Sequence, residues 1–194
     1  MYFSRSVSVR KFADFRRYRR LLRHDFLFRC AYCLRHELFL GGESGCTIDH
    51  HRPHAGPNGR PDLASVYDNL YWCCRECNEN KGVTWPSAAE FAAGWRFLDP
   101  CQPADDHDLH MQVHPNGNLE PTTNCGKYTS DRLKLWRDPL VYYRAEIIRC
   151  SQEASRIRGL LESVAVPDDY RLLLEGLLRE MDPWLNPPVF SRPR

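Results

Sequence analysis

Long hydrophobic runs are missing from the sequence. Segment 1–7 has no apolar stretch of the kind that signal peptides carry, and no run of about 20 apolar residues, the length of a membrane-spanning helix, follows it. We therefore expect a protein that is neither secreted nor embedded in a membrane and that works in the cytoplasm. Internal repeats and low-complexity segments are also absent, so the 194 residues suit one ordinary domain or a small catalytic core with an extension.

A strong net charge is missing as well. The 27 basic and 25 acidic residues leave a net charge of +2, so the total gives no reason to expect binding to nucleic acid. The distribution is more informative, because a crowded basic segment near the N-terminus suits a phosphate backbone. Arg16 and Arg20 are our candidates there, although such a run can equally be a solvated face of the helix expected over 11–28. The basic residues of this segment are Arg10, Lys11, Arg16, Arg17, Arg19, Arg20 and Arg23.

Cysteine, in contrast, is abundant. Nine cysteines in a chain expected to be cytoplasmic should be reduced, which favours metal binding over disulfides. Two pairs have C-x-x-C spacing, Cys30 with Cys33 and Cys74 with Cys77. Four thiolates in two such pairs are typical of a tetrahedral structural Zn²⁺ site. The alternative is four reduced core cysteines that share this spacing by coincidence, which is the role we expect for the remaining five.

Between the two cysteine pairs lie side chains that suit phosphodiester hydrolysis. That reaction needs an activated water, stabilisation of charge on the phosphoryl oxygens and help for the leaving oxygen. Asp49 offers a hard carboxylate oxygen to a divalent cation, and His50 titrates near neutrality and can take a proton from water. Neighbouring strand residues point to opposite faces. A bulge or the end of the strand must therefore turn both side chains toward one substrate.

This stretch resembles the zinc-stapled ββα-metal nucleases of the HNH superfamily. The resemblance rests on Asp49-His50 with Pro53, on Asn69-Leu70, and on Cys74-x-x-Cys77-Asn78-x-x-Lys81-Gly82. It implies that Asp49 and Asn78 bind the catalytic metal and that His50 is the general base. It also implies that Asn69 organises the loop and orients the base.

One position departs from the usual motif. Its last residue is often histidine and here is Asn78, which makes an HNN variant that the superfamily tolerates. Because an amide oxygen is a harder ligand than imidazole, we expect Mg²⁺ or Mn²⁺ at the catalytic position. A site that keeps the fold without activity is the alternative. We expect His51 to face away from the site, with a role near the phosphate as its alternative, and His54 to be solvated.

A narrower resemblance extends over most of the chain. It is to the HNH subunits of Septu-type and retron-associated antiphage systems, in which a separately encoded ATPase of the ABC/SMC-like kind accompanies the nuclease. This resemblance implies an ATPase partner and a role in antiphage defence, with regulation because an unrestrained nuclease would damage its host. Its residues are the segments 18–33, 71–72, 81–86, 97–100 and 126–129, followed by Leu135 and Arg144.

The expected fold class is α+β. A strand over 47–50, a turn-rich loop over 53–61, a strand over 70–73 and a helix from Cys74 to Lys81, ended by Gly82, form a ββα-metal core stapled by the four cysteines. A capping box at Ser87 predicts a helix that carries Phe91, Trp95 and Leu98, and alternation over 109–113 predicts a hairpin. We expect residues 1–98 to form the nuclease domain. Residues 99–194 should form a helical extension that packs on this domain or serves assembly.

The C-terminal part carries apolar residues at helical spacing. They predict one helix from Asp138-Pro139 to Val164 and a second from about Asp168 to Met181, with Pro167 between them. An antiparallel helical hairpin is the simplest arrangement. A coiled coil in a homo-oligomer is the alternative, because the apolar seam is about three heptads long. The tail from Pro183 on should be loosely ordered.

The sequence therefore predicts a metal-dependent HNH endonuclease. Arg52 and Lys81 are further candidates for phosphate contact, although either could be an ordinary surface charge. The substrate is DNA by default from the superfamily, with RNA such as transfer RNA left open, since base-reading residues leave no legible pattern. Two alternatives remain: a zinc-stapled nucleic-acid-binding module without catalysis, and an effector that is silent until an ATPase or a phage trigger engages the hairpin.

Overall fold

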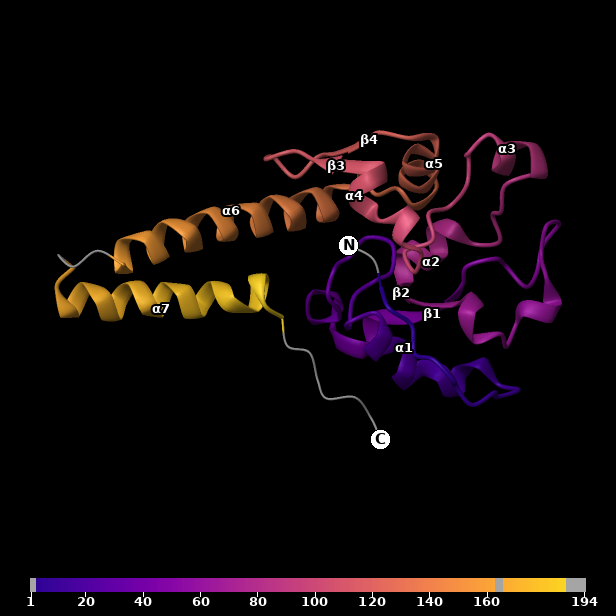
Figure 1. Cartoon of the computed structure of the whole chain (residues 1–194), viewed down its shortest axis with the longest axis horizontal. Coiled ribbons are helices and arrows are strands. Elements are labelled where there is room, and N and C mark those ends of the chain that lie inside the picture. The colour runs from indigo at the N-terminus through magenta and orange to yellow at the C-terminus, as the bar shows by residue number, and fades with distance from the viewer. Residues whose placement is uncertain (1–2, 163–165, 188–194) are drawn as a thin grey trace.

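A long helical hairpin projects from a body of short helices and two small sheets (Figure 1). The computed structural model describes residues 3–162 and 166–187. The combination of helices with two small antiparallel sheets confirms the α+β class. In chain order the elements are α1 (Arg19–Asp25), β1 (Cys46–His50), β2 (Leu70–Cys74), α2 (Arg75–Lys81), α3 (Ala88–Ala92), α4 (His107–His110), β3 (Met111–Val113), β4 (Leu119–Pro121), α5 (Asn124–Leu133), α6 (Asp138–Leu161) and α7 (Asp168–Leu185).

The predicted ββα order is confirmed. Strands β1 and β2 pair antiparallel, with Cys46 opposite Cys74 and His50 opposite Leu70. Helix α2 follows β2 directly, because Cys74 is both the last strand residue and the N-cap of the helix. Gly82 ends the helix with φ of +52°, a backbone conformation that glycine adopts most readily.

The N-terminal helix is shorter than the predicted range of 11–28. A 3-10 turn over Phe15–Tyr18 leads into α1, which ends at Asp25. The chain then leaves the helix because Leu27 and Phe28 have φ values of +51° and +59°. This change of direction leads into the first cysteine pair, so a tertiary requirement overrides the helical pattern.

Two further predictions were wrong in their extent. The capping box at Ser87 is present, but α3 ends at Ala92 and Gly94 follows with φ of +82°, so Trp95 and Leu98 lie outside the helix. Residues 109 and 110 belong to α4 rather than to the hairpin strand, because Asp106 caps that short helix. Helix α5, which the sequence analysis did not predict, begins where the Thr123 side chain accepts a hydrogen bond from the Gly126 N–H.

One hydrophobic core joins the two halves of the chain. Trp72 of β2 is fully buried, and the same cluster contains Leu133 at the end of α5 and Leu140 at the start of α6. The segment between α3 and α6 therefore packs on the ββα part. The hairpin of α6 and α7 leaves this core after its first turns (Figure 1).

The predicted helical hairpin is confirmed. Helices α6 and α7 pack on each other, and α6 buries Cys150, Ala154 and Ile157. Helix α6 ends at Leu161, so the predicted end at Val164 lies outside the described residues. Helix α7 continues to Leu185 with Pro183 in its last turn, so the predicted loose tail does not begin at 183. Among the described residues, no helix combines the length and apolar character needed to cross a bilayer.

Candidate functional site

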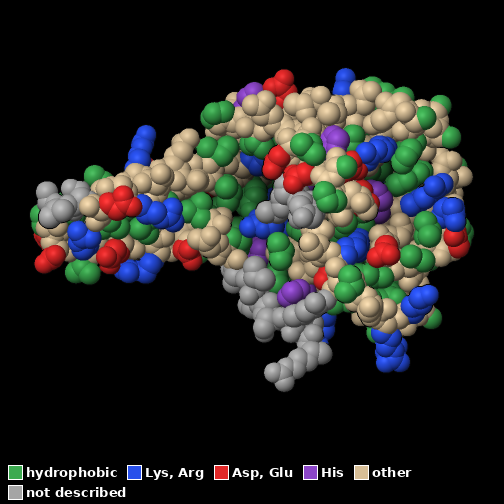
Figure 2. All heavy atoms as spheres, in the orientation of Figure 1, with side chains coloured by type: hydrophobic (Ala, Val, Ile, Leu, Met, Phe, Trp, Pro, Cys, Tyr) green, Lys and Arg blue, Asp and Glu red, His purple; other side chains and the backbone are tan. Residues whose placement is uncertain are grey.

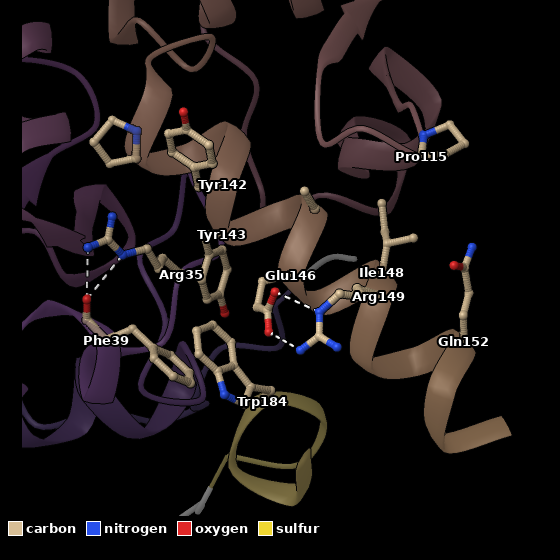
Figure 3. Close-up of a pocket in the computed structure, with 12 residues that line it drawn as sticks. Arg35, Phe39, Pro115, Tyr142, Tyr143, Glu146, Ile148, Arg149, Gln152 and Trp184 are labelled. Atoms are coloured by element: carbon tan, nitrogen blue, oxygen red, sulfur yellow. Dashed lines mark hydrogen bonds and ion pairs between the residues drawn. The ribbon is translucent and has the colours of Figure 1, made fainter. Parts of the chain in front are cut away.

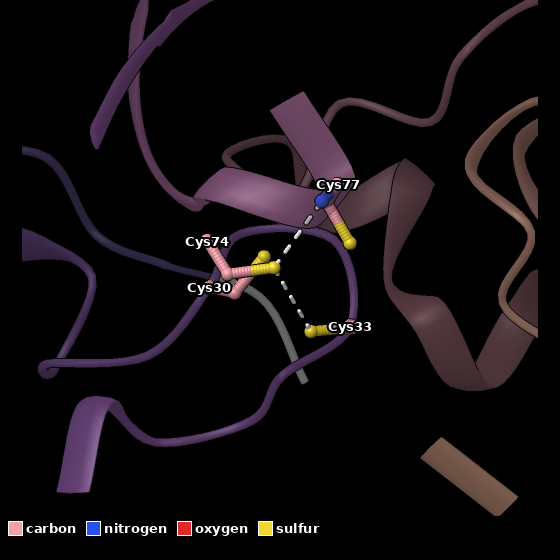
Figure 4. Close-up of side chains that lie close together, drawn as sticks. All are labelled: Cys30, Cys33, Cys74 and Cys77. Carbon is pink, nitrogen blue, oxygen red and sulfur yellow. Dashed lines mark hydrogen bonds between the residues drawn. The ribbon is translucent and has the colours of Figure 1, made fainter. Parts of the chain in front are cut away.

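The four cysteines of the two C-x-x-C pairs meet in the interior. All four are buried, and their sulfur atoms lie within 4.8 Å of one another (Figure 4). The Cys33 and Cys74 sulfurs are 3.9 Å apart, close to the separation of about 3.8 Å that tetrahedral zinc–thiolate bonds require. The donor set and its spacing therefore fit a structural Zn²⁺ ion.

The four thiols of the cluster differ in proton affinity. Hydrogen bonds within the cluster act in opposite directions on two of its thiols. Those with Cys30 and Cys33 lower the pKa of Cys74 and raise the pKa of Cys77. The guanidinium of Arg137, at the start of α6, donates to the Cys77 sulfur at 3.4 Å and pairs with Glu76 at 2.7 Å. Arg137 thus connects the cysteine cluster to the base of the hairpin.

Asp49 of β1 is 3% exposed. Its Oδ2 accepts a hydrogen bond from the Tyr32 hydroxyl at 2.6 Å, and its Oδ1 accepts one from the Lys81 ammonium at 3.0 Å. Lys81 also donates to the His50 carbonyl at 2.7 Å, and its side chain is fully buried. Tyr32 comes from the first cysteine turn and Lys81 from the end of α2, so both cysteine pairs help to position this carboxylate.

His50 points to the other side of β1. The strand pairs with β2 without a bulge up to His50, so the expected turning of both side chains toward one side is not seen in this structure. Its Nε2 lies 2.9 Å from the Ala64 carbonyl oxygen, and its ring contacts those of Phe15 and His54 at centroid distances of 4.8 and 4.3 Å. A carbonyl only accepts hydrogen bonds, so Nε2 carries the proton and Nδ1 keeps its lone pair. Burial lowers the pKa of His50, which favours the neutral ring.

Asn69 holds the chain that follows β1. Its Oδ1 accepts from the Arg52 N–H at 2.8 Å, and its Nδ2 donates to the Arg52 carbonyl at 2.9 Å and to the Leu63 carbonyl at 3.3 Å. Asn69 is 8% exposed, so these bonds form away from water, where they are strongest. The side chain ties the loop after β1 to the start of β2.

The remaining candidates lie around this centre. Asn78 is half-buried on α2, one turn before Lys81, and the two therefore share one face of that helix. His51 stacks on Tyr71 at 4.7 Å, and its Nδ1 lies 3.4 Å from the Tyr32 hydroxyl. Burial and the nearby charge of Lys81 lower the pKa of His51 to about 3. His51 thus lies on the Asp49 side of β1.

The four basic candidates differ in exposure. Arg16 and Arg20 are exposed, and Arg16 lies over the ring of Phe15, which contacts His50. Arg52 is half-buried over Trp85. Lys81 is enclosed by its partners and reaches no surface. On the face seen in Figure 2, Lys and Arg side chains are spread over the body and do not form a single patch.

A second group of metal-ligating side chains lies elsewhere in the described part of the chain. Asp105, His110 and Cys125 approach one another within 4.8 Å. The Asp105 carboxylate is already paired with Arg96 through two hydrogen bonds and also accepts from the Asp99 N–H at 2.9 Å. This existing positive partner explains the carboxylate without a metal.

The comparison with protein families identifies the segment that contains this site. Residues 30–84 match the family model of the HNH endonucleases. The matched HNH segment runs from the first cysteine of the cluster to just beyond α2, so it contains Asp49, His50, Asn69 and Asn78. No curated protein and no solved structure matched the chain.

Two positioning residues of the HNH segment and its surroundings escaped the sequence analysis. The position of Tyr32 inside the first C-x-x-C pair could have indicated a role near the site, but no spacing rule links Tyr32 to Asp49. Arg137 is 60 residues away from Cys77 in the sequence and carried none. Both contacts depend on tertiary packing.

Proposed function

We propose that the protein is a metal-dependent HNH endonuclease that hydrolyses phosphodiester bonds of DNA. The observation that carries the proposal is the hydrogen bond between His50 Nε2 and the Ala64 carbonyl. It leaves the Nδ1 lone pair to take a proton from the attacking water. The low pKa that burial gives His50 keeps the base deprotonated near neutral pH.

Asp49 and Asn78 are the residues that would hold the catalytic Mg²⁺ or Mn²⁺. Both are hard oxygen donors, and Lys81, one turn after Asn78 on the same face of α2, reaches the Asp49 carboxylate. A carboxylate has about four lone-pair sites, so its bonds to Tyr32 and Lys81 leave room for a cation. When bound, the cation would stabilise charge on the phosphoryl and leaving oxygens.

The other polar residues of the site are assigned to positioning and to phosphate contact. Asn69 holds the backbone of Arg52 from both sides, which keeps the loop after His50 in place. We assign Arg52 to a phosphate near the reacting group. Arg16 and Arg20 are assigned to phosphates farther along the substrate, because their exposed segment adjoins the His50 ring through Phe15.

Cleavage of supercoiled plasmid in Mg²⁺ or Mn²⁺ tests the proposal. We expect nicking or linearisation by the wild type and a loss of at least about a hundredfold in rate for His50→Ala, since general bases contribute factors of this size. His54→Ala is the matched control, because it removes the ring that contacts His50 without removing the base; we expect less than a tenfold loss. Equal cutting by wild type and His50→Ala would refute the assignment of the base.

The biological setting is proposed from the outer motifs alone. We infer that the protein is an antiphage effector of the cytoplasm whose activity is controlled by an ATPase partner of the ABC/SMC-like kind. The segments that support this are those that resemble Septu-type and retron-associated subunits, including the run over 81–86.

Copurification with an ABC/SMC-like ATPase from the same host tests this setting. We expect the two proteins to elute as one complex and the complex to cut plasmid faster than the isolated chain. If the isolated chain cuts at full rate and no complex forms, the control by an ATPase is wrong while the nuclease assignment stands. Transfer RNA supplied in the same assay would reveal an RNA substrate.

A further inference from the structure

A pocket of about 420 Å³ opens between the loop after β1 and the segment that leads into α3. Its lining includes Arg52, Asn58, Trp85 and Phe91. The volume lies within the range of roughly 300–1,000 Å³ that is usual for ligand pockets. Trp85 is half-buried and Phe91 is 48% exposed, so two aromatic side chains of the lining are open to water. We call this site the Trp85 pocket.

The walls of the Trp85 pocket are held together by the protein itself. Asn58 Nδ2, from the loop after β1, donates to the Trp85 carbonyl at 3.3 Å. A Cβ at Gly56 of the same loop would lie 3.0 Å from the Val83 Cβ, so the loop approaches this segment closely. Trp85 also contacts the buried ring of Phe97 at a centroid distance of 6.3 Å. The pocket is therefore formed before any ligand binds.

Contacts link the pocket to the candidate site. The Arg52 guanidinium lies 5.4 Å from the centre of the Trp85 ring, and Asn69 holds the Arg52 backbone. His51, on the Asp49 side of β1, contacts the Trp85 ring at a centroid distance of 5.3 Å. A nucleotide whose phosphate lies at this side of β1 therefore has the pocket beside it.

A larger pocket, of about 770 Å³, lies at the base of the hairpin and shows what the Trp85 pocket has in addition (Figure 3). Its lining is also aromatic and includes Phe39 and Trp184. Its two arginines are already engaged, because Arg35 donates twice to the Phe39 carbonyl and Arg149 is paired with Glu146. This larger pocket thus has aromatic walls without a cation that is free to bind an anion.

The Trp85 pocket has such a cation. Its lining contains no acidic residue, and Arg52 forms no ion pair within the part of the chain that the structure describes. The guanidinium nitrogens make two long contacts of 3.4 Å, both to the Asn58 carbonyl oxygen. An aromatic wall beside an unpaired guanidinium suits a flat ligand that carries negative charge. In a nucleotide, the base stacks on the ring and the phosphate pairs with the arginine.

We propose that the Trp85 pocket binds an unstacked nucleobase of the substrate, next to the phosphate that Arg52 contacts. The proposal rests on the proposed nuclease function and specifies its substrate more closely. A base inside a duplex has neighbours on both faces, so it must leave the helix to reach Trp85, and this costs least for a base that is already unpaired. The preferred substrate is therefore DNA with an unpaired nucleotide at the site of cutting, such as a bulge.

Binding of short DNA duplexes to the full chain, measured by fluorescence anisotropy without Mg²⁺ or Mn²⁺, tests the proposal. One duplex is fully paired and the other carries a single unpaired nucleotide. We expect the wild type to bind the second about tenfold more tightly, because stacking on one aromatic side chain contributes a factor of about this size. Trp85→Ala should bind both duplexes equally, while Trp85→Phe keeps a ring and should keep most of the preference.

Two further variants separate the loss of stacking from a damaged fold. Trp136→Ala removes a 57% exposed tryptophan outside the pocket and should keep the full preference. Phe91→Ala removes a half-exposed ring of the pocket, so it should reduce the preference several-fold and leave urea unfolding unchanged. Equal affinity of the wild type for the two duplexes would overturn the proposal. A preference that survives both Trp85→Ala and Phe91→Ala would do so as well.

Cross-linking identifies the ring that the base contacts. Ultraviolet light joins 5-iododeoxyuridine, placed at the unpaired position, to an aromatic side chain that it stacks on, with loss of iodide. We expect mass spectrometry to find the adduct on Trp85. An adduct confined to aromatic residues outside the pocket would refute the assignment.

Cleavage of the same two duplexes in Mn²⁺ distinguishes this proposal from the nuclease assignment. If the wild type prefers the bulged duplex and cuts neither, the base pocket stands and the nuclease assignment fails. If the wild type cuts both duplexes at the same rate and binds them equally, the nuclease assignment stands and the base pocket is wrong.

Discussion

Asp49 has two hydrogen-bond partners of different kinds, and each has a separate effect on the carboxylate. Tyr32 offers a neutral hydroxyl from the cysteine turn, and Lys81 offers a buried charge from α2. The hydroxyl fixes the direction of the carboxylate. The ammonium supplies an opposite charge inside the protein, where an unpaired charge would be costly.

Replacement of Tyr32 by Phe should separate positioning from folding. The ring keeps its packing, but Asp49 loses a hydrogen bond worth about 1 kcal/mol. We expect the zinc content and the fold to be retained, while the concentration of Mn²⁺ needed for half-maximal cleavage rises several-fold. Zinc by elemental analysis, urea unfolding and plasmid cleavage measure the three quantities. An unchanged Mn²⁺ requirement would contradict a positioning role for Tyr32.

Replacement of Lys81 by Met should instead act on stability. The variant leaves the Asp49 carboxylate buried without its cation, and breaking such a pair costs about 3 kcal/mol. Urea unfolding should show this loss. The matched control Lys127→Met changes an exposed lysine and should stay within about 0.5 kcal/mol of the wild type. Equal stabilities for the two variants would show that the buried ion pair is not required.

At the scale of elements, the turn between β3 and β4 is fitted closely to α6. Gly117 has φ of +84°, and a Cβ at this position would lie 2.1 Å from the Val141 carbonyl oxygen. Arg144 also donates to the Gly117 carbonyl at 2.7 Å. The small hairpin therefore supports the first turns of α6 at the point where that helix leaves the body.

Two glycine substitutions should have opposite effects on stability. Gly117→Ala must move the turn away from α6 and should cost at least about 2 kcal/mol. Gly159→Ala, in the helical part of α6 where a Cβ meets nothing within 4 Å, should add up to about 1 kcal/mol. Urea unfolding of both variants measures these changes. A Gly117→Ala protein as stable as the wild type would show that the turn does not hold α6.

At the scale of the whole molecule, the cysteine cluster joins parts of the chain that are far apart. The four cysteines belong to the same buried cluster as Leu133 and Leu140, and Arg137 links Cys77 to the start of α6. A structural metal in such a place contributes to the stability of the entire core.

Loss of one cysteine ligand should therefore unfold the body as a unit. We expect about one zinc per chain in the wild type, and loss of both zinc and tertiary structure in Cys74→Ser. Elemental analysis and near-ultraviolet circular dichroism measure the two. Cys101→Ser, outside the cluster, is the matched control and should retain both. A folded, zinc-free Cys74→Ser protein would show that the cluster is not a structural metal site.

Local signals in the sequence were sufficient for several parts of this fold. The two C-x-x-C pairs identified the cysteine cluster, since four ligands of one type at short spacing have few other uses. The ββα order followed from a strand pattern and from Gly82, and the helical hairpin followed from apolar spacing and Pro167. The metal ions and the roles of Asp49, His50 and Asn78 stay predictions.

Where the helical preference of a segment competes with tertiary packing, the sequence alone did not predict the structure. Phe12 and Phe15 fit a helical stripe, yet the helix starts only at Arg19, because packing of the basic segment against the body determines its path. Lys81 was a candidate for phosphate contact, with an ordinary surface charge as the alternative, because nothing in its sequence neighbourhood reveals burial. Its partner Asp49 lies 32 positions earlier.

The sequence by itself determined which chemistry is available: four thiols, a carboxylate, an imidazole and two amides in the order that the HNH segment needs. The tertiary structure decided how those groups are paired. It bonded Tyr32 and Lys81 to Asp49, turned His50 toward the Ala64 carbonyl, and left Tyr170 and Leu173 of α7 exposed on a projecting hairpin. Residue types and short spacings are written in the sequence, whereas contacts between distant residues arise only when the core closes and buries them.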